Sequence, residues 1–295
     1  MPLKALLIQL NARKPEIFVW IWSTAVGCML ATHGFPPIEK TLLAVSSITA
    51  LAISGYTYND IADLRGDSLN PIKKKVRPIT SGKLTVKDAM KIVWVFGLLG
   101  IFISAFTTLR AFLLTLIWSF LLYAYSHPKI RLKKRFMLKE IIISFGFFLV
   151  ILIGALSVGT LSPVVLFGSI LMCAFSIFFL PAIRESPDIE EDKLHGVKSL
   201  SMLISLKGRV EMAILFVLVI MTLTPLTYVQ LNLNVVFPII TVASCFIVLR
   251  FLFPLLKRFD LETHRYAYRA VYGFWMILQA SLIVGTLPLS IPIGI

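Results

Sequence analysis

The sequence predicts an all-α polytopic membrane protein with nine transmembrane helices. The chain is 58% hydrophobic, and its mean hydropathy is +0.88. A soluble fold cannot bury that much apolar surface. The apolar residues gather in segments that approach the ~20 residues needed to cross a bilayer. These segments lack the alternation of strands, and lipid requires backbone polar groups to be satisfied internally, so each segment is expected to be a helix.

Nine apolar segments follow one another along the chain, and Pro254 ends or kinks the eighth. They are residues 17–32, 42–58, 92–108, 111–126, 141–159, 163–183, 212–229, 235–249 and 267–289. No Gly-Pro-Ser linker or low-complexity tract interrupts them, so residues 1–295 are predicted to form a single domain. The three cysteines lie in apolar segments without metal-ligand spacing, which is typical of small buried side chains.

The loop charges predict the orientation in the membrane. Of the 29 Lys and Arg residues, all but Lys40 and Arg110 fall on one side of the nine segments. The positive-inside rule then puts the N-terminus in the cytoplasm and the C-terminus outside, in the cell membrane. Topology accounts for the net charge of +14, so no nucleic acid partner is expected. Residues 1–14 predict an amphipathic helix on the membrane surface rather than a cleaved signal peptide.

An acidic motif directly follows the second apolar segment. Asn59, Asp63 and Asp67 are spaced i, i+4, i+8, and Asp60 lies beside them. If the helix continues, the three lie on one face, ~6 Å apart along the axis. Carboxylates so placed repel one another unless a cation lies among them. Mg²⁺ binds such oxygens together with substrate phosphates, and the basic residues within 73–77 suit phosphate. The alternative for the basic residues is a solvated loop that marks the cytoplasmic side.

The acidic motif occurs twice. Glu185, Asp188 and Asp192 each lie 125 positions after Asp60, Asp63 and Asp67. Both copies end a long apolar segment and lead into a basic stretch that contains glycine. Matched spacing is unlikely to arise by chance in a chain with only 15 acidic residues. We therefore expect the two motifs to face each other across a central cavity that opens to the cytoplasm and to lipid.

Several stretches resemble the UbiA superfamily of intramembrane prenyltransferases. NDIADLRGD and the following RPITSG resemble its NxxxDxxxD and RPxxSG motifs, and DIEEDKLHGVKSL resembles its second DxxxD motif. YSHPKIRLKK and NARKPE resemble two weaker family segments, so the resemblance covers nearly the whole chain in order. One departure is LKEIII, which stands where many members carry a Gly-Asn pair; the site around Glu140 is therefore expected to differ.

The resemblance implies transfer of a polyprenyl group from an isoprenyl diphosphate to a lipophilic acceptor. It implies two Mg²⁺ ions, which Mn²⁺ can replace, and a membrane lipid environment. The acceptor classes in the superfamily are a quinone precursor, a prenylated glycerol phosphate and a tetrapyrrole; the second motif favours lipid-ether or chlorophyll-type members. The implied metal ligands and catalytic residues are Asn59, Asp63, Asp67, Asp188 and Asp192, with Arg77, Arg131 and Lys198 on the diphosphate.

Three further residues have two interpretations each. Asp60 and Glu185 either contact and position the metal ligands without binding the metal, or help to remove a proton from the acceptor. Tyr125 either points into the cavity or anchors the chain at the membrane interface.

Two other functions compete with prenyl transfer. A cation- or proton-coupled transporter would also use acidic residues, but such sites lie near the bilayer midplane rather than at helix ends. A phosphotransferase of the CDP-alcohol type would need a DGxxAR sequence before the acidic motif, and neither motif here has one.

Overall fold

The computed structural model describes residues 3–184 and 200–288. Within these ranges every regular element is helical, which confirms the predicted all-α class. The long helices are α1 (Leu3–Ala31), α2 (Ile38–Ala62), α5 (Val86–Ser104), α6 (Leu109–Ser126), α7 (Leu138–Val158), α8 (Pro163–Phe179), α11 (Leu206–Thr227), α12 (Val236–Leu252) and α13 (Leu261–Thr286). The short ones are α3 (Leu64–Asp67), α4 (Pro71–Val76), η1 (Leu132–Lys134), η2 (Leu180–Arg184), α10 (Leu200–Leu203) and η4 (Phe253–Leu256).

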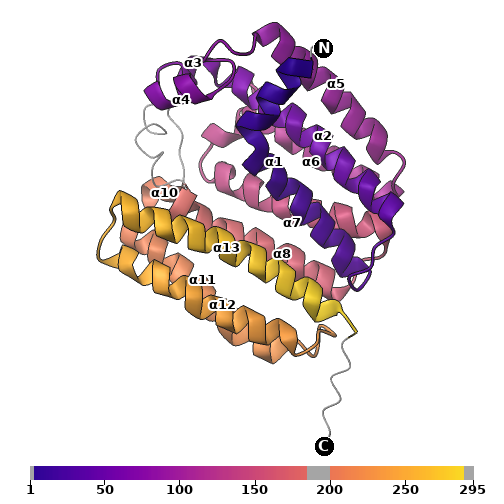
Figure 1. Cartoon of the computed structure of the whole chain (residues 1–295), viewed down its shortest axis with the longest axis vertical. Coiled ribbons are helices and arrows are strands. Elements are labelled where there is room, and N and C mark those ends of the chain that lie inside the picture. Colours follow the sequence, from indigo (N-terminus) through magenta and orange to yellow (C-terminus); the bar gives the residue numbers. More distant parts are fainter. Residues whose placement is uncertain (1–2, 185–199, 289–295) are drawn as a thin grey trace, which may run out of the picture.

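The long helices form one bundle in which α1, α2, α5, α6 and α7 occupy one part and α8, α11, α12 and α13 the other (Figure 1). The closest helix pairs include α2 with α5, α1 with α7, and α12 with α13. Glycines allow α1 and α7 to approach backbone to backbone. A Cβ on Gly27 would lie 2.1 Å from the carbonyl oxygen of Ile151, and one on Gly154 would lie 2.1 Å from that of Thr24. Small residues at such crossings are typical of membrane helix packing.

Seven helices in the described ranges are long and apolar enough to cross a membrane. They are α2, α6, α7, α8 with η2, α11, α12 with η4, and α13. The other two long helices are not among these candidates: α1 contains Arg13, Lys14 and Glu16, and the 19 residues of α5 include Lys87, Asp88 and Lys91. The chain is therefore an integral membrane protein with seven candidate spans, and the count of nine stays a prediction.

The N-terminal amphipathic stretch is continuous with the helix of the first apolar segment. α1 runs without interruption from Leu3 to Ala31 and contains Pro15. Gln9 and Arg13, one turn apart, are both buried. They lie on the face of α1 that meets α2, where Asp60 accepts hydrogen bonds from both. This polar contact holds the first turns of α1 against the bundle.

Candidate functional site

The first acidic motif lies where α2 passes into α3. Asp63 separates the two helices with φ −97° and ψ 0°, in a sparsely populated region of backbone conformation. The helical register nevertheless continues, since the Asp63 amide donates to the Asn59 carbonyl and the Asp67 amide to the Asp63 carbonyl, both at 2.9 Å. The i, i+4, i+8 spacing therefore places the three residues in successive turns, as the sequence predicts.

The segment between α6 and α7 brings cations onto this motif. Lys133 donates to the Asp63 carboxylate, and the guanidinium of Arg131 lies 3.4 Å from the other carboxylate oxygen. Asn59 Oδ1 accepts from Lys133 at 3.2 Å and from the Ser126 hydroxyl at 2.7 Å. Arg131 has φ +44°, in the left-handed region that costs energy for residues other than glycine. The chain reverses there and presents both cations to one carboxylate.

Asp67 has a different environment from Asp63. Its side chain is nearly buried, and the closest cation is the Arg77 guanidinium, 4.0 Å away. Burial and the nearby Asp63 raise the pKa of the Asp67 carboxyl, while Lys73 and Arg77 oppose the shift. Burial also lowers the pKa of Lys133, against the attraction of Asp63. In the first motif, two close cations neutralise the Asp63 carboxylate, whereas the charge of the Asp67 carboxylate is less well compensated.

Asp60 points away from the other motif carboxylates and toward α1. Arg13 donates to both of its oxygens, and the Gln9 amide donates at 2.8 Å. Asp60 is 2% exposed and Arg13 is 4% exposed, so this ion pair is buried. The Arg13 guanidinium also lies 5.3 Å from the centre of the Tyr56 ring and pairs with Glu16 at 3.2 Å. These contacts favour a role for Asp60 in supporting the neighbouring acidic residues over direct contact with an acceptor substrate.

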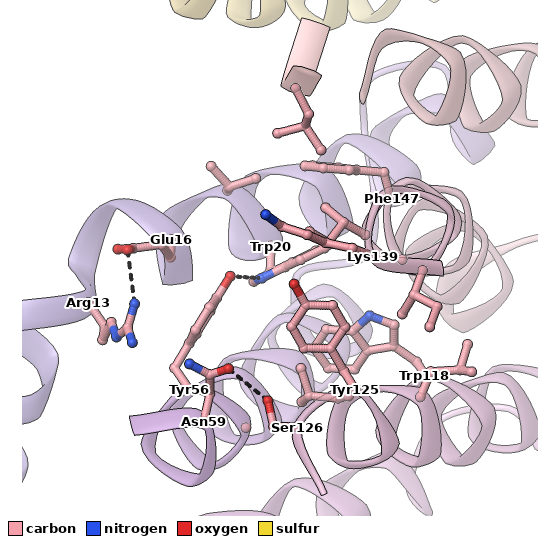
Figure 2. Close-up of a pocket in the computed structure, with 18 residues that line it drawn as sticks. Arg13, Glu16, Trp20, Tyr56, Asn59, Trp118, Tyr125, Ser126, Lys139 and Phe147 are labelled. Atoms are coloured by element: carbon pink, nitrogen blue, oxygen red, sulfur yellow. Dashed lines mark hydrogen bonds and ion pairs between the residues drawn. The ribbon is translucent and has the colours of Figure 1, made fainter. Parts of the chain in front are cut away.

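A cavity of about 230 Å³, here called cavity A, opens beside the motif between α1, α2, α6 and α7. Figure 2 shows Tyr56, Asn59 and Tyr125 around it, with the Trp20 indole donating to the Tyr56 hydroxyl at 2.8 Å. Trp118 and Phe147 also line it. Tyr125 therefore faces a cavity, and the Lys133 ammonium lies 5.8 Å from its ring centre. Asn59 is the residue of the first motif that reaches this lining.

A second cavity of about 260 Å³, cavity B, lies between α1, α8 and α13. Its lining is largely apolar and aromatic, with Phe175, Phe179, Tyr272 and Trp275 among its members. Glu16, Val19, Phe147 and Leu180 border both cavities. Cavity B thus extends the space beside the acidic motif toward α13.

The second acidic motif lies outside the described residues, and so do Glu185, Asp188, Asp192 and Lys198 individually. The structure describes both flanks of this segment. Before it, the buried Arg209 of α11 donates to the Pro181 carbonyl at 2.8 Å, and His264 of α13 lies 2.7 Å from the Ile183 carbonyl. After it, Glu140 of α7 accepts from the Leu200 amide at 2.6 Å. These contacts fix where the segment leaves α8 and where it enters α10.

Sequence reasoning missed three polar residues that meet the motif. Lys133 lies two positions after Arg131, and the reversal at Arg131 that turns it toward Asp63 has no signature in the sequence. Ser126 stands next to Tyr125 in a segment already singled out, so its contact with Asn59 could have been suspected. Arg13 belongs to the NARKPE stretch, but its partnership with Asp60 depends on how α1 packs against α2.

The donor set suits a hard cation. Asn59, Asp63 and Asp67 offer only oxygen atoms in successive turns, the ligands that Mg²⁺ prefers. Among the described residues, no group of three or more His, Cys, Asp or Glu side chains is close enough to hold a metal by itself. Asp63 and Asp67 thus offer two carboxylates of the kind through which Mg²⁺ binds together with substrate phosphates.

The comparisons with known proteins agree with this geometry. The UbiA prenyltransferase family model matches residues 20–278. Digeranylgeranylglyceryl phosphate synthase of Sulfurisphaera tokodaii is 26% identical over 258 residues, covering 85% of this chain and 87% of that protein. 4-Hydroxybenzoate octaprenyltransferase of Francisella tularensis subsp. novicida is 27% identical over 146 residues, covering 49% of this chain and 50% of that protein.

A solved structure shares the fold at lower identity. A UbiA homologue from Archaeoglobus fulgidus bound to DMAPP and Mg²⁺ has a TM-score of 0.71 and 16% identity. The match covers 94% of this chain and 97% of that one.

Proposed function

The chain belongs to the UbiA prenyltransferase family and is a prenyltransferase, and from that premise we propose its substrates and the roles of its residues. It transfers a polyprenyl group from an isoprenyl diphosphate to a prenylated glycerol phosphate, with Mg²⁺ as cofactor. One observation carries the proposal: Asn59 and Asp63 meet two cations at the border of an aromatic cavity. The archaeal lipid synthase matches most of the chain and the quinone-type enzyme only half, which favours the lipid acceptor.

The acidic residues are assigned to metal and diphosphate. Asn59, Asp63 and Asp67 hold one side of the diphosphate, and Asp188 and Asp192 the other. When bound, Mg²⁺ supplies positive charge that stabilises the departing diphosphate. The carbon–oxygen bond to the diphosphate breaks, the acceptor oxygen bonds to the allylic carbon, and a proton is released. Each motif would hold one of two Mg²⁺ ions, and Mn²⁺ is expected to replace them.

The basic residues are assigned to the diphosphate oxygens. Lys133 and Arg131 neutralise Asp63 in the absence of substrate, and Arg77 lies next to Asp67. With Asp63 and Asp67 holding the metal, Lys133, Arg131 and Arg77 would be available to stabilise the charge of the diphosphate. Lys198 joins them from the second motif. Asp60, held by Arg13, and Glu185 act as supporting residues.

The two cavities are assigned to the apolar parts of the substrates. Cavity A, with Tyr125, Trp20 and Trp118, lies beside the motif and receives the reacting end of the prenyl group. Aromatic faces there stabilise the developing allylic cation, and the apolar side chains of the lining limit its contact with water. Cavity B, lined by Phe175 and Trp275, takes the hydrocarbon chain of the acceptor.

The membrane topology completes the proposal. All nine long helices cross the bilayer, with the N-terminus and both acidic motifs on the cytoplasmic side, where soluble Mg²⁺ is available. A cysteine at Lys74 and one at Lys134 should both react with a membrane-impermeant thiol reagent from the cytoplasmic face only. One at Ile295 should react from outside only. Labelling of the two loops from opposite faces would refute this topology.

The substrate assignment is tested with purified protein and labelled geranylgeranyl diphosphate. We expect transfer to geranylgeranylglyceryl phosphate, no transfer to 4-hydroxybenzoate, and complete loss of activity in excess EDTA that Mg²⁺ or Mn²⁺ restores. Turnover in EDTA would contradict the metal role. Equal or better transfer to 4-hydroxybenzoate would contradict the acceptor while leaving the family reaction intact.

A further inference from the structure

The outer face of α12 and α13 carries a groove of about 290 Å³ that belongs to neither cavity A nor cavity B. On α13 it is bordered by Arg269, Gly273 and Ile277, whereas cavity B meets Tyr272 and Trp275. Helical periodicity puts these two sets on opposite faces of α13. The groove is therefore separate from the proposed reaction site.

Gly273 gives the groove its depth. A Cβ atom added there would meet no other atom within 4 Å, so the space in front of this glycine is open. Ile247 and Phe251 of α12 form the facing wall, and Ile247 is 58% exposed. Along α13 the lining extends from Tyr266 to Ile277, which is ~16 Å at 1.5 Å per residue. An apolar channel of this length suits one extended hydrocarbon chain.

One end of the groove is polar and positively charged. Tyr266 and Arg269 line it there, and both are exposed. Arg265 lies one helical turn before Arg269, and Arg250 lies in the last turn of α12. Residues 250–269 contain five Lys or Arg and two acidic residues, a net charge of +3.

We propose that this groove binds one membrane lipid with an anionic head group. The head group lies on Arg269 and Tyr266, and one hydrocarbon chain lies along Gly273. Arginine matches a phosphate with two parallel hydrogen bonds, and basic pockets between membrane helices favour anionic lipids. α12 and α13 are both candidate spans, so their outer faces meet lipid directly. A second copy of the chain is a poorer occupant, because a two-fold contact would bring the two positive ends together.

Native mass spectrometry of the purified chain tests the site. The protein is mixed with equal amounts of phosphatidylglycerol and phosphatidylcholine, and we expect one retained phosphatidylglycerol in severalfold excess over phosphatidylcholine. Arg269→Gln should remove most of that preference. Gly273→Leu should abolish retention of either lipid at this site, and Gly273→Ala, which adds a methyl group without filling the groove, should not. Lys87→Gln, an exposed charge on α5 in the other part of the bundle, is the matched control and should bind as the wild type does (Figure 1).

Three results would overturn the proposal. The first is equal retention of the two lipids by the wild type. The second is a phosphatidylglycerol preference that survives Arg269→Gln, or that falls equally in Lys87→Gln. The third is a mass that corresponds to two chains and disappears with Gly273→Leu, which would assign the groove to a dimer. Activity of the Gly273 variants with geranylgeranyl diphosphate shows that they are folded, since the groove lies outside the reaction site.

Discussion

Asp63 and Asp67 belong to one acidic motif but should respond differently to the same substitution. Replacing either with asparagine preserves the size of the side chain and removes its charge. Asp63 pairs with Lys133 and Arg131, and the Lys133 side chain is only 12% exposed. Asp63→Asn leaves this nearly buried ammonium without its counter-charge. Asp67 has one ion pair, with Arg77 at 4.0 Å, and Lys73 acts on it only from a greater distance, so Asp67→Asn removes much less attraction.

The magnitudes follow from these environments. Loss of one partner from a fully buried ion pair costs about 3–5 kcal/mol. Asp63 is 22% exposed, and solvent screening reduces that figure to about 2 kcal/mol. Such a loss lowers the unfolding temperature of a chain of this size by roughly 4–8 °C. Repulsion among like charges, which the sequence alone suggests for this motif, therefore does not dominate at Asp63.

For Asp67→Asn the free energy of unfolding is not expected to fall. Its pKa is raised in the folded chain, so the fold favours the protonated carboxyl. That contribution is present below the unfolded pKa and is lost as the pH rises through the folded pKa. At neutral pH the ionised carboxylate is disfavoured in the fold, so Asp67→Asn should leave the free energy of unfolding unchanged or raise it slightly.

The assay is a thermal-unfolding series with and without Mg²⁺ and geranylgeranyl diphosphate. A ligand at 100 times its dissociation constant stabilises the wild type by about 2.7 kcal/mol. Both variants should lose this ligand-linked shift and the transfer activity. Asp67→Asn with normal ligand stabilisation would refute its role as a ligand. Asp63→Asn with the thermal stability of the wild type would refute the importance of its ion pairs.

Three further substitutions test the surrounding structure. Asp60→Asn should destabilise the chain by about 3 kcal/mol, because the buried Arg13 loses the Asp60 charge and, among the described residues, keeps only that of Glu16. The folded fraction should still bind Mg²⁺ and prenyl diphosphate. Gly27→Ala should lower the free energy of unfolding by about 1–3 kcal/mol, since its Cβ would lie 2.1 Å from the Ile151 carbonyl oxygen. Glu140→Ala should raise the Mg²⁺ concentration needed for half-maximal transfer, and Glu140→Gln, which keeps an acceptor oxygen for the start of α10, should not.

The helical fold could be predicted from the sequence because length and hydropathy determine it locally. Each predicted apolar segment corresponds to a long helix in the described ranges. The continuous α1 could not be predicted in this way. Its first turns mix apolar and polar residues, and Gln9 and Arg13 are buried where Asp60 of α2 accepts their hydrogen bonds. That pairing joins residues 47 and 51 positions apart, which no local pattern encodes.

The part of the candidate site that depends on local helical spacing could also be predicted from the sequence. Spacing alone places Asn59, Asp63 and Asp67 in successive turns, and the structure keeps that register through the break at Asp63. The cations were harder to assign, since the basic segment after α6 offers six Lys or Arg at similar positions. The reversal at Arg131 selects Lys133 for the inner position, and such a reversal depends on tertiary contacts.

Mn²⁺ binding measured by electron paramagnetic resonance tests the central claim most directly. The claim is that two motifs far apart in the sequence hold one metal–diphosphate site. Wild-type protein should bind Mn²⁺ tightly only when geranylgeranyl diphosphate is present. Asp67→Asn and Asp188→Asn should each abolish this diphosphate-dependent binding, although 121 positions separate the two residues. Undiminished Mn²⁺ binding in either variant would contradict a single shared site.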